Sequence, residues 1–163
     1  MWNATARKEA GRALHQAGFT LVELLIVIAI LAILASLGIV NHIAVLERAR
    51  DGQRKADLLQ MQAALELYRT DTGRYPEVAS LTSCGGSLAN GSITYLRRIP
   101  CDPKGTTFYN DGIYPYGTDA DGSTYWITAC MENSNDSDTR VTTAPPAGAP
   151  TCENSRYFSV FNP

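Results

Sequence analysis

The sequence predicts an α+β fold in which one long N-terminal helix packs on a small antiparallel sheet of three to four strands. No proline interrupts the chain from Phe19 to about Thr70, so one continuous helix is possible there. The head, residues 73–163, contains short runs of β-branched and aromatic residues between turn residues, which is typical of strands. A helix with one apolar face beside a few strands buries that face on the sheet.

The first half of the predicted helix is apolar on every side. Between Phe19 and Val40 the only polar residues are Thr20, Glu23 and Ser36. About 20 apolar residues are enough to span a bilayer, and a helix that is apolar all round is buried in lipid or among other helices. Residues 19–40 are therefore predicted to form a transmembrane segment.

The second half of the helix, which ends at about residue 72, is predicted to dock on the head. Apolar residues recur along one face at helical spacing: Leu58, Met61, Leu65 and Tyr68. This spacing indicates an amphipathic helix with one buried side. Gly73 suits the C-cap and Pro76 blocks continuation of the helix.

A basic cluster lies in the same half of the helix: Arg48, Arg50, Arg54 and Lys55. Such a cluster could bind DNA or lipid head groups. Its acidic neighbours, Glu47, Asp51 and Asp57, favour instead a solvated, charge-mixed helix face. The net charge of −2 at pH 7 also provides no basic field, so nucleic acid is not expected as a direct specific ligand.

Two stretches of the head, residues 92–100 and 123–131, are predicted strands because they are rich in β-branched and aromatic residues. Asp121-Gly122 is a turn signal and is expected to form a hairpin apex before the second stretch. Asn110-Asp111-Gly112 is a further turn signal.

Four cysteines follow the apolar run: Cys84, Cys101, Cys130 and Cys152. Four cysteines allow three pairings, and no cysteine or histidine spacing indicates a zinc site. An even number beyond an apolar N-terminal segment predicts disulfides in an oxidising compartment. The sequential pairing, Cys84 with Cys101 and Cys130 with Cys152, is favoured because each bond closes a local loop. Residues 133–151 between the second pair are rich in Asn, Ser, Asp and Pro, which predicts an exposed, tethered loop.

Glu23 is unexpected within a predicted transmembrane segment, because placing a carboxylate at hydrocarbon depth costs a few kcal/mol. A cleaved secretory signal has a shorter apolar stretch than this one. A simple signal anchor leaves Glu23 without a partner. If the chain is cut between Gly18 and Phe19, however, the new α-ammonium lies four residues before Glu23 and can pair with it, within one helix or between neighbouring helices.

The stretch "GFTLVELLIVIAILAIL", residues 18–34, resembles the class III signal of type IV prepilins and type II secretion pseudopilins. The resemblance implies that a membrane prepilin peptidase cuts after Gly18 and that the new N-terminal Phe19 is methylated. It implies that Glu23 is the assembly carboxylate. Residues 1–18 are then a leader, residues 19–72 the long helix and residues 73–163 the pilin head.

The resemblance implies a structural subunit and no enzyme, and the head has no histidine to serve as a general base. The expected partners are identical or homologous pilin subunits, the prepilin peptidase, the assembly machinery of the cytoplasmic membrane, and the lipid bilayer before assembly. The four cysteines and the tethered loop favour a type IV pilus subunit, held in the cytoplasmic membrane and then assembled into an extracellular filament for motility, adhesion or DNA uptake. The alternatives are a pseudopilin of type II secretion, with which "IPCDPKG" (99–105) shares an Asp-Pro stretch, and an anchored periplasmic binding or catalytic domain.

The sequence leaves three details open: a calcium site, loosening of the long helix and glycosylation. Acidic loops bind calcium in secretion pseudopilins, but the spacing of Asp119 and Asp121 does not match an EF-hand and favours a turn. No cofactor is expected. Family members often carry a proline near the end of the apolar stretch, whereas this chain has Val40, so loosening of the helix would depend on Gly38. Two Asn-x-Ser triplets, at Asn90 and Asn135, fit a glycosylation pattern that often arises by chance.

Overall fold

The computed structural model describes residues 18–107 and 112–162. The predicted leader before Gly18, and Asn110 and Asp111 of the predicted turn, lie outside these residues. The chain forms two compact units, residues 1–40 and 41–163. In order along the chain, its elements are α1 (Leu21–Thr72), η1 (Val78–Leu81), β1 (Leu88–Asn90), β2 (Ile93–Leu96), η2 (Gly105–Thr107), β3 (Tyr116–Thr118), β4 (Tyr125–Cys130), β5 (Val141–Thr142) and β6 (Tyr157–Phe161).

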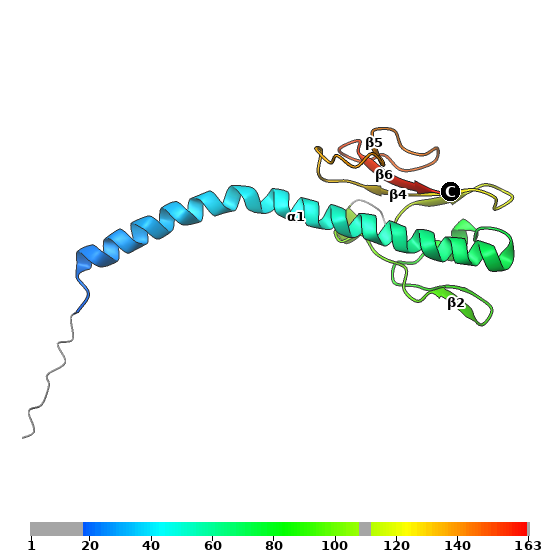
Figure 1. Ribbon diagram of the computed structural model, residues 1–163, viewed down its shortest axis with the longest axis horizontal. Coiled ribbons are helices and arrows are strands. Elements are labelled where there is room, and N and C mark those ends of the chain that lie inside the picture. The colour runs from blue at the N-terminus through cyan, green and yellow to red at the C-terminus, as the bar shows by residue number, and fades with distance from the viewer. Residues whose placement is uncertain (1–17, 108–111, 163) are drawn as a thin grey trace, which may run out of the picture. The chain divides into compact units, whose positions relative to one another are not determined.

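α1 is a helix of 52 residues (Figure 1). It ends where the sequence predicts. Gly73 adopts a φ of +79°, and its N–H donates to the carbonyl oxygen of Arg69 at 2.7 Å. A glycine in this left-handed conformation closes a helix without the steric penalty of a side chain.

The first unit contains the apolar half of α1, whose side chains from Leu21 to Ser36 are exposed in the isolated chain. Within residues 18–107 and 112–162, no helix combines the length and the apolarity needed to cross a membrane. The assignment of residues 19–40 as a transmembrane segment stays a prediction. The side chains of residues 37–41 lie outside the described ones, and loosening of the helix near Gly38 also stays a prediction.

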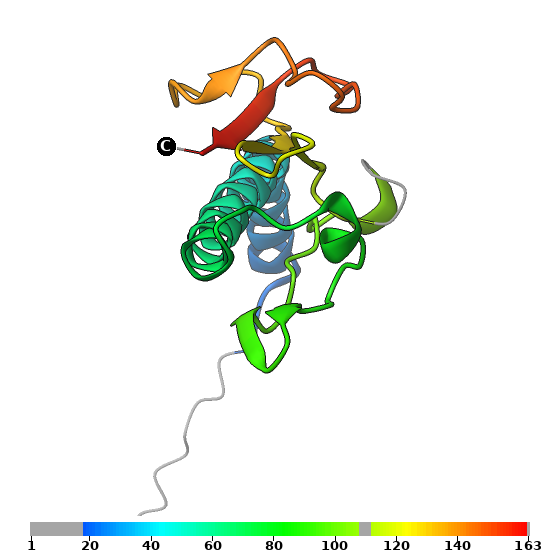
Figure 2. The ribbon, with the colours of Figure 1, turned by 90° about the vertical axis from the view of Figure 1, so that its right-hand side faces the viewer.

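The second unit is an α+β head, as predicted. A four-stranded antiparallel sheet in the order β3-β4-β6-β5 lies along one side of α1 (Figures 1 and 2). A separate β1-β2 hairpin lies on the other side of the helix in both views. The core between the layers contains the predicted helix residues Leu58, Met61 and Leu65 together with Ile127 and Phe158 of the sheet.

The predicted strands are found with two differences. β3 and β4 form the hairpin around Gly122, as expected, whereas residues 92–100 supply only β2, which pairs with β1 and not with the main sheet. β6, the strand between β4 and β5, was not predicted. Its Phe158 and Ser159 are buried against β4, where Thr128 Oγ1 lies 2.8 Å from Ser159 Oγ.

The stretch from 133 to 151 is exposed or half-buried, as predicted, and it is also attached to the rest of the head. Val141 and Thr142 form β5 and pair with Phe158 and Tyr157 of β6. Lys55 Nζ of α1 also lies 2.7 Å from Asp136 Oδ2 and 3.2 Å from Asp138 Oδ2. Acidic and β-branched residues within a polar stretch therefore attach it to the helix and to the sheet.

Candidate functional site

Gly18, Phe19 and Thr20 precede α1, and Thr20 forms its N-cap. The N–H of Glu23 donates to Thr20 Oγ1 at 3.2 Å. In return, the N–H and the hydroxyl of Thr20 donate to Glu23 Oε2 at 3.0 and 2.8 Å. This reciprocal arrangement of a threonine and a glutamate three residues apart is a capping box.

The capping box has two consequences for the predicted site residues. It gives the Glu23 carboxylate hydrogen-bond donors within its own chain, so the charge is not without a partner before any processing. It also starts the helix at Leu21, which leaves the Gly18–Phe19 peptide bond outside regular structure. The Phe19 side chain is 82% exposed.

A second group of polar residues is buried in the head, and we call Asp51, Arg54, Asp102 and Glu132 the buried ion cluster. The Arg54 side chain is 0% exposed. Its guanidinium donates to Asp102 at 2.7 and 3.1 Å, to Asp51 at 2.8 Å and to Glu132 at 2.7 Å. Burial alone would lower the pKa of Arg54, but the hydrogen bonds to Asp102 and Glu132 raise it well above its usual value.

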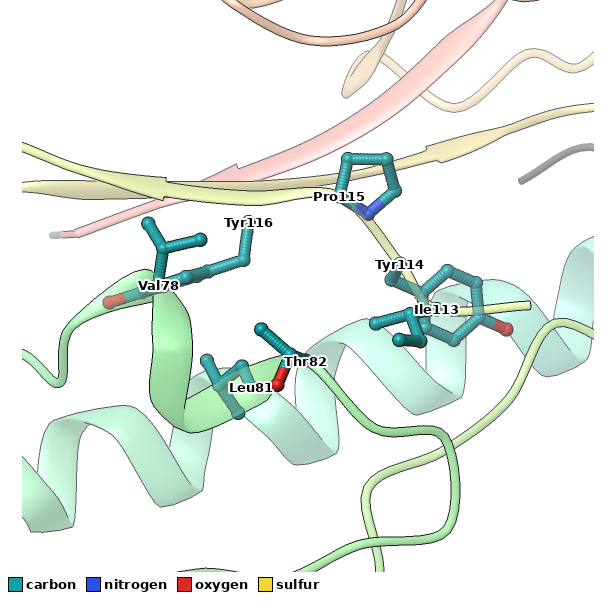
Figure 3. A pocket seen from close by; sticks show the side chains of 7 residues that line it. All are labelled: Val78, Leu81, Thr82, Ile113, Tyr114, Pro115 and Tyr116. Carbon is teal, nitrogen blue, oxygen red and sulfur yellow. The ribbon is translucent and has the colours of Figure 1, made fainter. Parts of the chain in front are cut away.

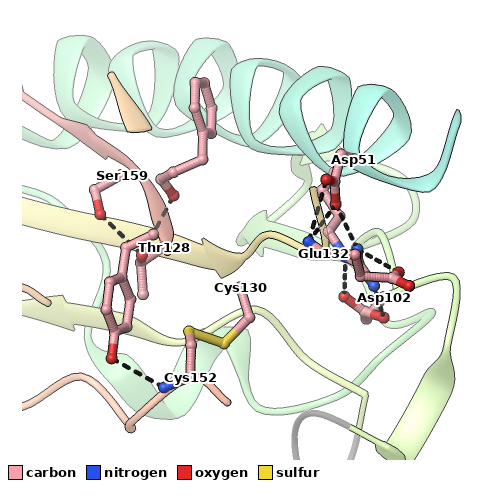
Figure 4. Close-up of a disulfide and its surroundings, with 10 residues drawn as sticks. Asp51, Asp102, Thr128, Cys130, Glu132, Cys152 and Ser159 are labelled. Carbon is pink, nitrogen blue, oxygen red and sulfur yellow. Dashed lines mark hydrogen bonds and ion pairs between the residues drawn. A yellow bond between two sulfur atoms is a disulfide. The ribbon is translucent and has the colours of Figure 1, made fainter. Parts of the chain in front are cut away.

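The carboxylates of the cluster have further partners. Asp51 accepts the backbone N–H groups of Glu132 and Asn133, at distances between 2.8 and 3.1 Å. Glu132 also binds Arg50, with Nε to Oε1 at 2.7 Å, and Lys104, with Nζ to Oε2 at 2.9 Å. Figure 4 shows Asp51, Asp102 and Glu132 grouped beneath the helix. The cluster fastens α1 to the segments that carry Asp102 and Glu132.

The expectation of a solvated basic face is therefore wrong for Arg54, and Asp51 is also buried. The physical reason is helical register, since Asp51 and Arg54 continue the three-and-four spacing of the buried residues Leu58, Met61 and Leu65. That spacing was visible in the sequence. The carboxylates that neutralise Arg54 were not, because Asp102 and Glu132 lie 48 and 78 residues further along the chain.

Glu132 should make the stability of the head depend on pH. Burial raises its pKa, but hydrogen bonds from Arg50, Lys104 and Arg54 outweigh this and lower it from 4.5 to about 2. A carboxylate with a lowered folded-state pKa contributes stability above pH 4.5 that is lost as the pH falls towards 2. We expect Glu132→Gln to be less stable than the parent at pH 7 by roughly 1.5–3 kcal/mol. Urea unfolding should show this difference closing between pH 4.5 and 2, and a constant difference would contradict the assignment.

The structure joins Cys84 to Cys101 and Cys130 to Cys152, which is the pairing favoured from the sequence. Both bonds adjoin the buried ion cluster. Asp102 follows Cys101 directly, and Glu132 lies two residues after Cys130 (Figure 4). Each disulfide therefore holds a segment that supplies one carboxylate to Arg54.

Replacing both Cys130 and Cys152 with serine should lower the free energy of unfolding by about 3 kcal/mol, because the bond closes a loop of 22 residues. Thermal unfolding under oxidising conditions measures the loss. The same double change at Cys84 and Cys101 is the control for cysteine removal, since that bond closes a comparable loop of 17 residues. Amide exchange should rise in residues 133–151 only in the first variant; equal exchange in both variants would contradict the tether.

Asp119 caps a turn through hydrogen bonds to the residues that follow it. Asp119 Oδ1 accepts the N–H groups of Ser123 and Thr124 at 2.7 and 3.2 Å, and the Ser123 hydroxyl donates to Oδ2. The hydrogen bond from the Ser123 side chain is the main reason that the pKa of Asp119 falls to about 2. Among residues 18–107 and 112–162, no group of three or more His, Cys, Asp or Glu side chains is placed to hold a metal ion.

A shallow groove of about 250 Å³ lies between η1 and the segment that leads into β3 (Figure 3). It is lined mainly by apolar and aromatic residues, including Val78, Leu81 and Tyr116. The tyrosine hydroxyls at this groove are engaged elsewhere, because Tyr116 donates to the carbonyl of Pro76 and Tyr114 donates to Asp57. The groove thus offers apolar surface and no reactive group.

Comparison with known proteins finds one family match for each of two adjoining segments of the chain. Residues 14–39 match the prokaryotic N-terminal methylation motif, and residues 41–122 match the type II secretion system (T2SS) protein G family. The chain belongs to the type II secretion system protein G family. It is 35% identical over 102 residues to type II secretion system core protein G of Pectobacterium carotovorum subsp. carotovorum, a match that covers 58% of this chain and 65% of that protein.

Two further relatives have the same description. The core protein G of Klebsiella pneumoniae is 35% identical over 102 residues, which cover 58% of this chain and 73% of the relative. That of Pseudomonas aeruginosa is 30% identical over 102 residues, with 58% and 72% covered. No solved structure matches the chain at a significant level.

Membership of the protein G family confirms the predicted pilin and pseudopilin resemblance, and the family consists of secretion-system core proteins and not of enzymes. It favours the pseudopilin alternative over the type IV pilus subunit that the sequence placed first. The matched region ends at residue 122. In this protein G family member, Glu132, the Cys130–Cys152 bond and strands β4 to β6 therefore lie beyond the matched region.

Proposed function

We propose that this protein G family member is a pseudopilin, a structural subunit that polymerises into the filament of a type II secretion system. The observation that carries the proposal is the pair of adjoining matches, the methylation motif over residues 14–39 and protein G over residues 41–122. The filament would stand in the periplasm, with subunits joined through their N-terminal helices. The precursor would be anchored in the cytoplasmic membrane by residues 19–40.

The N-terminal geometry supports the proposed processing. A peptidase needs access to the bond that it cuts, and the Gly18–Phe19 bond lies outside the helix. Cleavage there would create an α-ammonium at Phe19, one residue before Thr20 of the capping box. The Glu23 carboxylate could then exchange donors, from Thr20 of its own chain to a free amine. Methylation of Phe19 would leave that amine positively charged.

The head supports a structural role in assembly. The buried ion cluster fastens α1 to the segments that carry Asp102 and Glu132, and the two disulfides cross-link those segments within the head. A pull on the helix would therefore reach cross-linked parts of the head. The expected partners are other copies of the chain or related pseudopilins, the prepilin peptidase, and the assembly machinery of the cytoplasmic membrane.

Intact mass and N-terminal sequencing, combined with cell fractionation, test the proposal. We expect a chain that begins at N-methylated Phe19, is found in the membrane and periplasmic fractions, and is required for protein secretion through the type II system. Two results together would instead support a type IV pilus that serves motility, adhesion or DNA uptake: abundant processed chain in sheared surface filaments, and normal secretion by cells that lack the protein. A chain that retains Met1 would overturn both.

A further inference from the structure

The last strand of the head is paired unequally on its two sides. β6 pairs with β4 along all of its length, from Tyr157 to Phe161. On its other side, β5 pairs with Tyr157 and Phe158 alone. Within residues 112–162, no strand therefore covers that side of residues 159–161. Natural proteins usually cover such an edge, because its unpaired backbone groups can bind another strand.

The residues that are placed to cover this edge directly precede β5. The register of β5 on β6 pairs Val141 with Phe158. If the same antiparallel register is continued, residues 138–140 come to lie opposite residues 159–161. The stretch 138–140 contains neither proline nor glycine, so nothing in its sequence prevents it from extending β5.

A cavity of about 300 Å³ lies beside the uncovered edge, lined by Gln62 of α1, by Arg140 and by residues 159–161. Residues that lie opposite each other in a sheet point to the same face. In an extended β5, Thr139 would therefore point with Val160 to the face that packs against α1, where Val160 is buried. The Thr139 side chain would then enter the cavity.

Contacts of Asp138 hold residues 138–140 away from the edge. Lys55 Nζ of α1 lies 3.2 Å from Asp138 Oδ2, and we call this ion pair the latch. Asp138 Oδ1 accepts the N–H of Arg140 at 3.0 Å, and the Asp138 carbonyl accepts the N–H of Val141 at 2.9 Å. These bonds fold residues 138–140 into a turn instead of a continuation of β5.

The latch and an extended β5 exclude each other. Lys55 lies on the face of the sheet toward α1, with Nζ 5.6 Å from the centre of the Phe158 ring. Because side chains alternate between the two faces along a strand, Asp138 in an extended β5 would point with Phe161 to the opposite face. Closing would thus separate Asp138 from Lys55. It would also move the Arg140 guanidinium off the Phe158 ring, whose centre is now 4.8 Å away.

We infer that residues 138–140 are a strap that can close on β6, and that the Lys55–Asp138 latch holds it open. In the closed form β5 would begin at Asp138, cover residues 159–161 and fill the cavity. The two side chains of the latch are 20% and 21% exposed, and an ion pair of this kind is weak enough to open reversibly. The strap lies beyond the region matched to protein G, and the inference does not rest on the proposed function.

A cross-link between the strap and β6 tests whether the strap closes. Thr139→Cys and Val160→Cys are combined in one chain, because the closed register places these positions opposite each other, within reach of a disulfide. All four native cysteines are in disulfides, so the introduced pair supplies the only free thiols. The full chain in detergent is treated with diamide, and peptide mapping over time gives the rate of cross-linking.

Variants of this double-cysteine chain test the latch. Lys55→Gln should raise the rate of cross-linking about two- to fivefold, because it removes an ion pair that exists only in the open form. Lys55→Arg, which keeps the charge, and Arg48→Gln, which removes an exposed cation elsewhere on α1, should cross-link at the rate of the unaltered pair. Equal rates for Lys55→Gln and Arg48→Gln would overturn the latch. Absence of the cross-link from every variant would overturn the strap.

Amide hydrogen exchange, measured without introduced cysteines, separates a switch from simple support of the head. If Lys55 only stabilised the head, Lys55→Gln would speed exchange in β6. If the latch holds the strap open, the same change should slow exchange in residues 159–161 about two- to fivefold, because closing pairs their backbone groups. Faster or unchanged exchange of residues 159–161 in Lys55→Gln would overturn the inference.

Discussion

Replacing Arg54 with methionine is expected to destabilise the head by roughly 3–5 kcal/mol, the largest effect on stability of any single change considered. Methionine has a similar length and fits an apolar surrounding, so the expected loss of stability comes from removing the positive charge. In the parent the Arg54 side chain is 0% exposed. Without its guanidinium, the carboxylates of Asp51, Asp102 and Glu132 remain close together and have lost the cation that neutralises them. Chemical unfolding of the full chain in detergent, followed by tryptophan fluorescence, measures the change.

Two variants control for this effect. Arg48→Met removes an exposed cation from the same helix, and it should change the free energy of unfolding by no more than about 0.5 kcal/mol. Arg54→Lys keeps the charge but cannot reproduce the paired contacts with Asp102, so an intermediate loss is expected. If Arg54→Met were as stable as Arg48→Met, the cluster would not hold the helix to the head.

The features that the sequence predicted well are those encoded by neighbouring residues. The end of α1 at Gly73 follows from a glycine and a nearby proline, and the β3–β4 hairpin follows from Asp121-Gly122. The N-terminal motif is a contiguous stretch, and it indicated the wider pilin and pseudopilin resemblance by itself. Each of these signals lies within a few residues of the structure that it produces.

The features that the sequence did not reveal depend on contacts between distant residues. β6 lies between β4 and β5 because its backbone pairs with both, and no local turn announces that position. The partners of Arg54 come from three separate parts of the chain. The sequence motif also did not decide between pilus and pseudopilus, because the two classes share it. The similarity that favours the pseudopilus extends through residues 41–122, which include the second half of α1 and the first part of the head.

Neutralising Glu23 is expected to abolish assembly while leaving processing intact, the largest effect on function. After cleavage the α-ammonium of Phe19 needs an anionic partner away from water. Leaving a buried charge without its partner costs roughly 3–5 kcal/mol, which corresponds to a loss of more than about a hundredfold in the equilibrium for adding a subunit. Glu23→Gln and Glu23→Val should both be cut after Gly18, as intact mass will show, and neither should appear in filaments.

Comparing these two variants separates the charge of Glu23 from its role in the capping box. Glutamine can still accept the N–H and hydroxyl of Thr20 at the third helical position, whereas valine cannot. If the charge is what assembly requires, the two variants fail equally. If Glu23→Gln assembles like the parent and only Glu23→Val fails, the carboxylate serves to start the helix, and the amine of Phe19 must find its partner elsewhere. Thr20→Ser, which retains the hydroxyl of the cap, should assemble normally in either case.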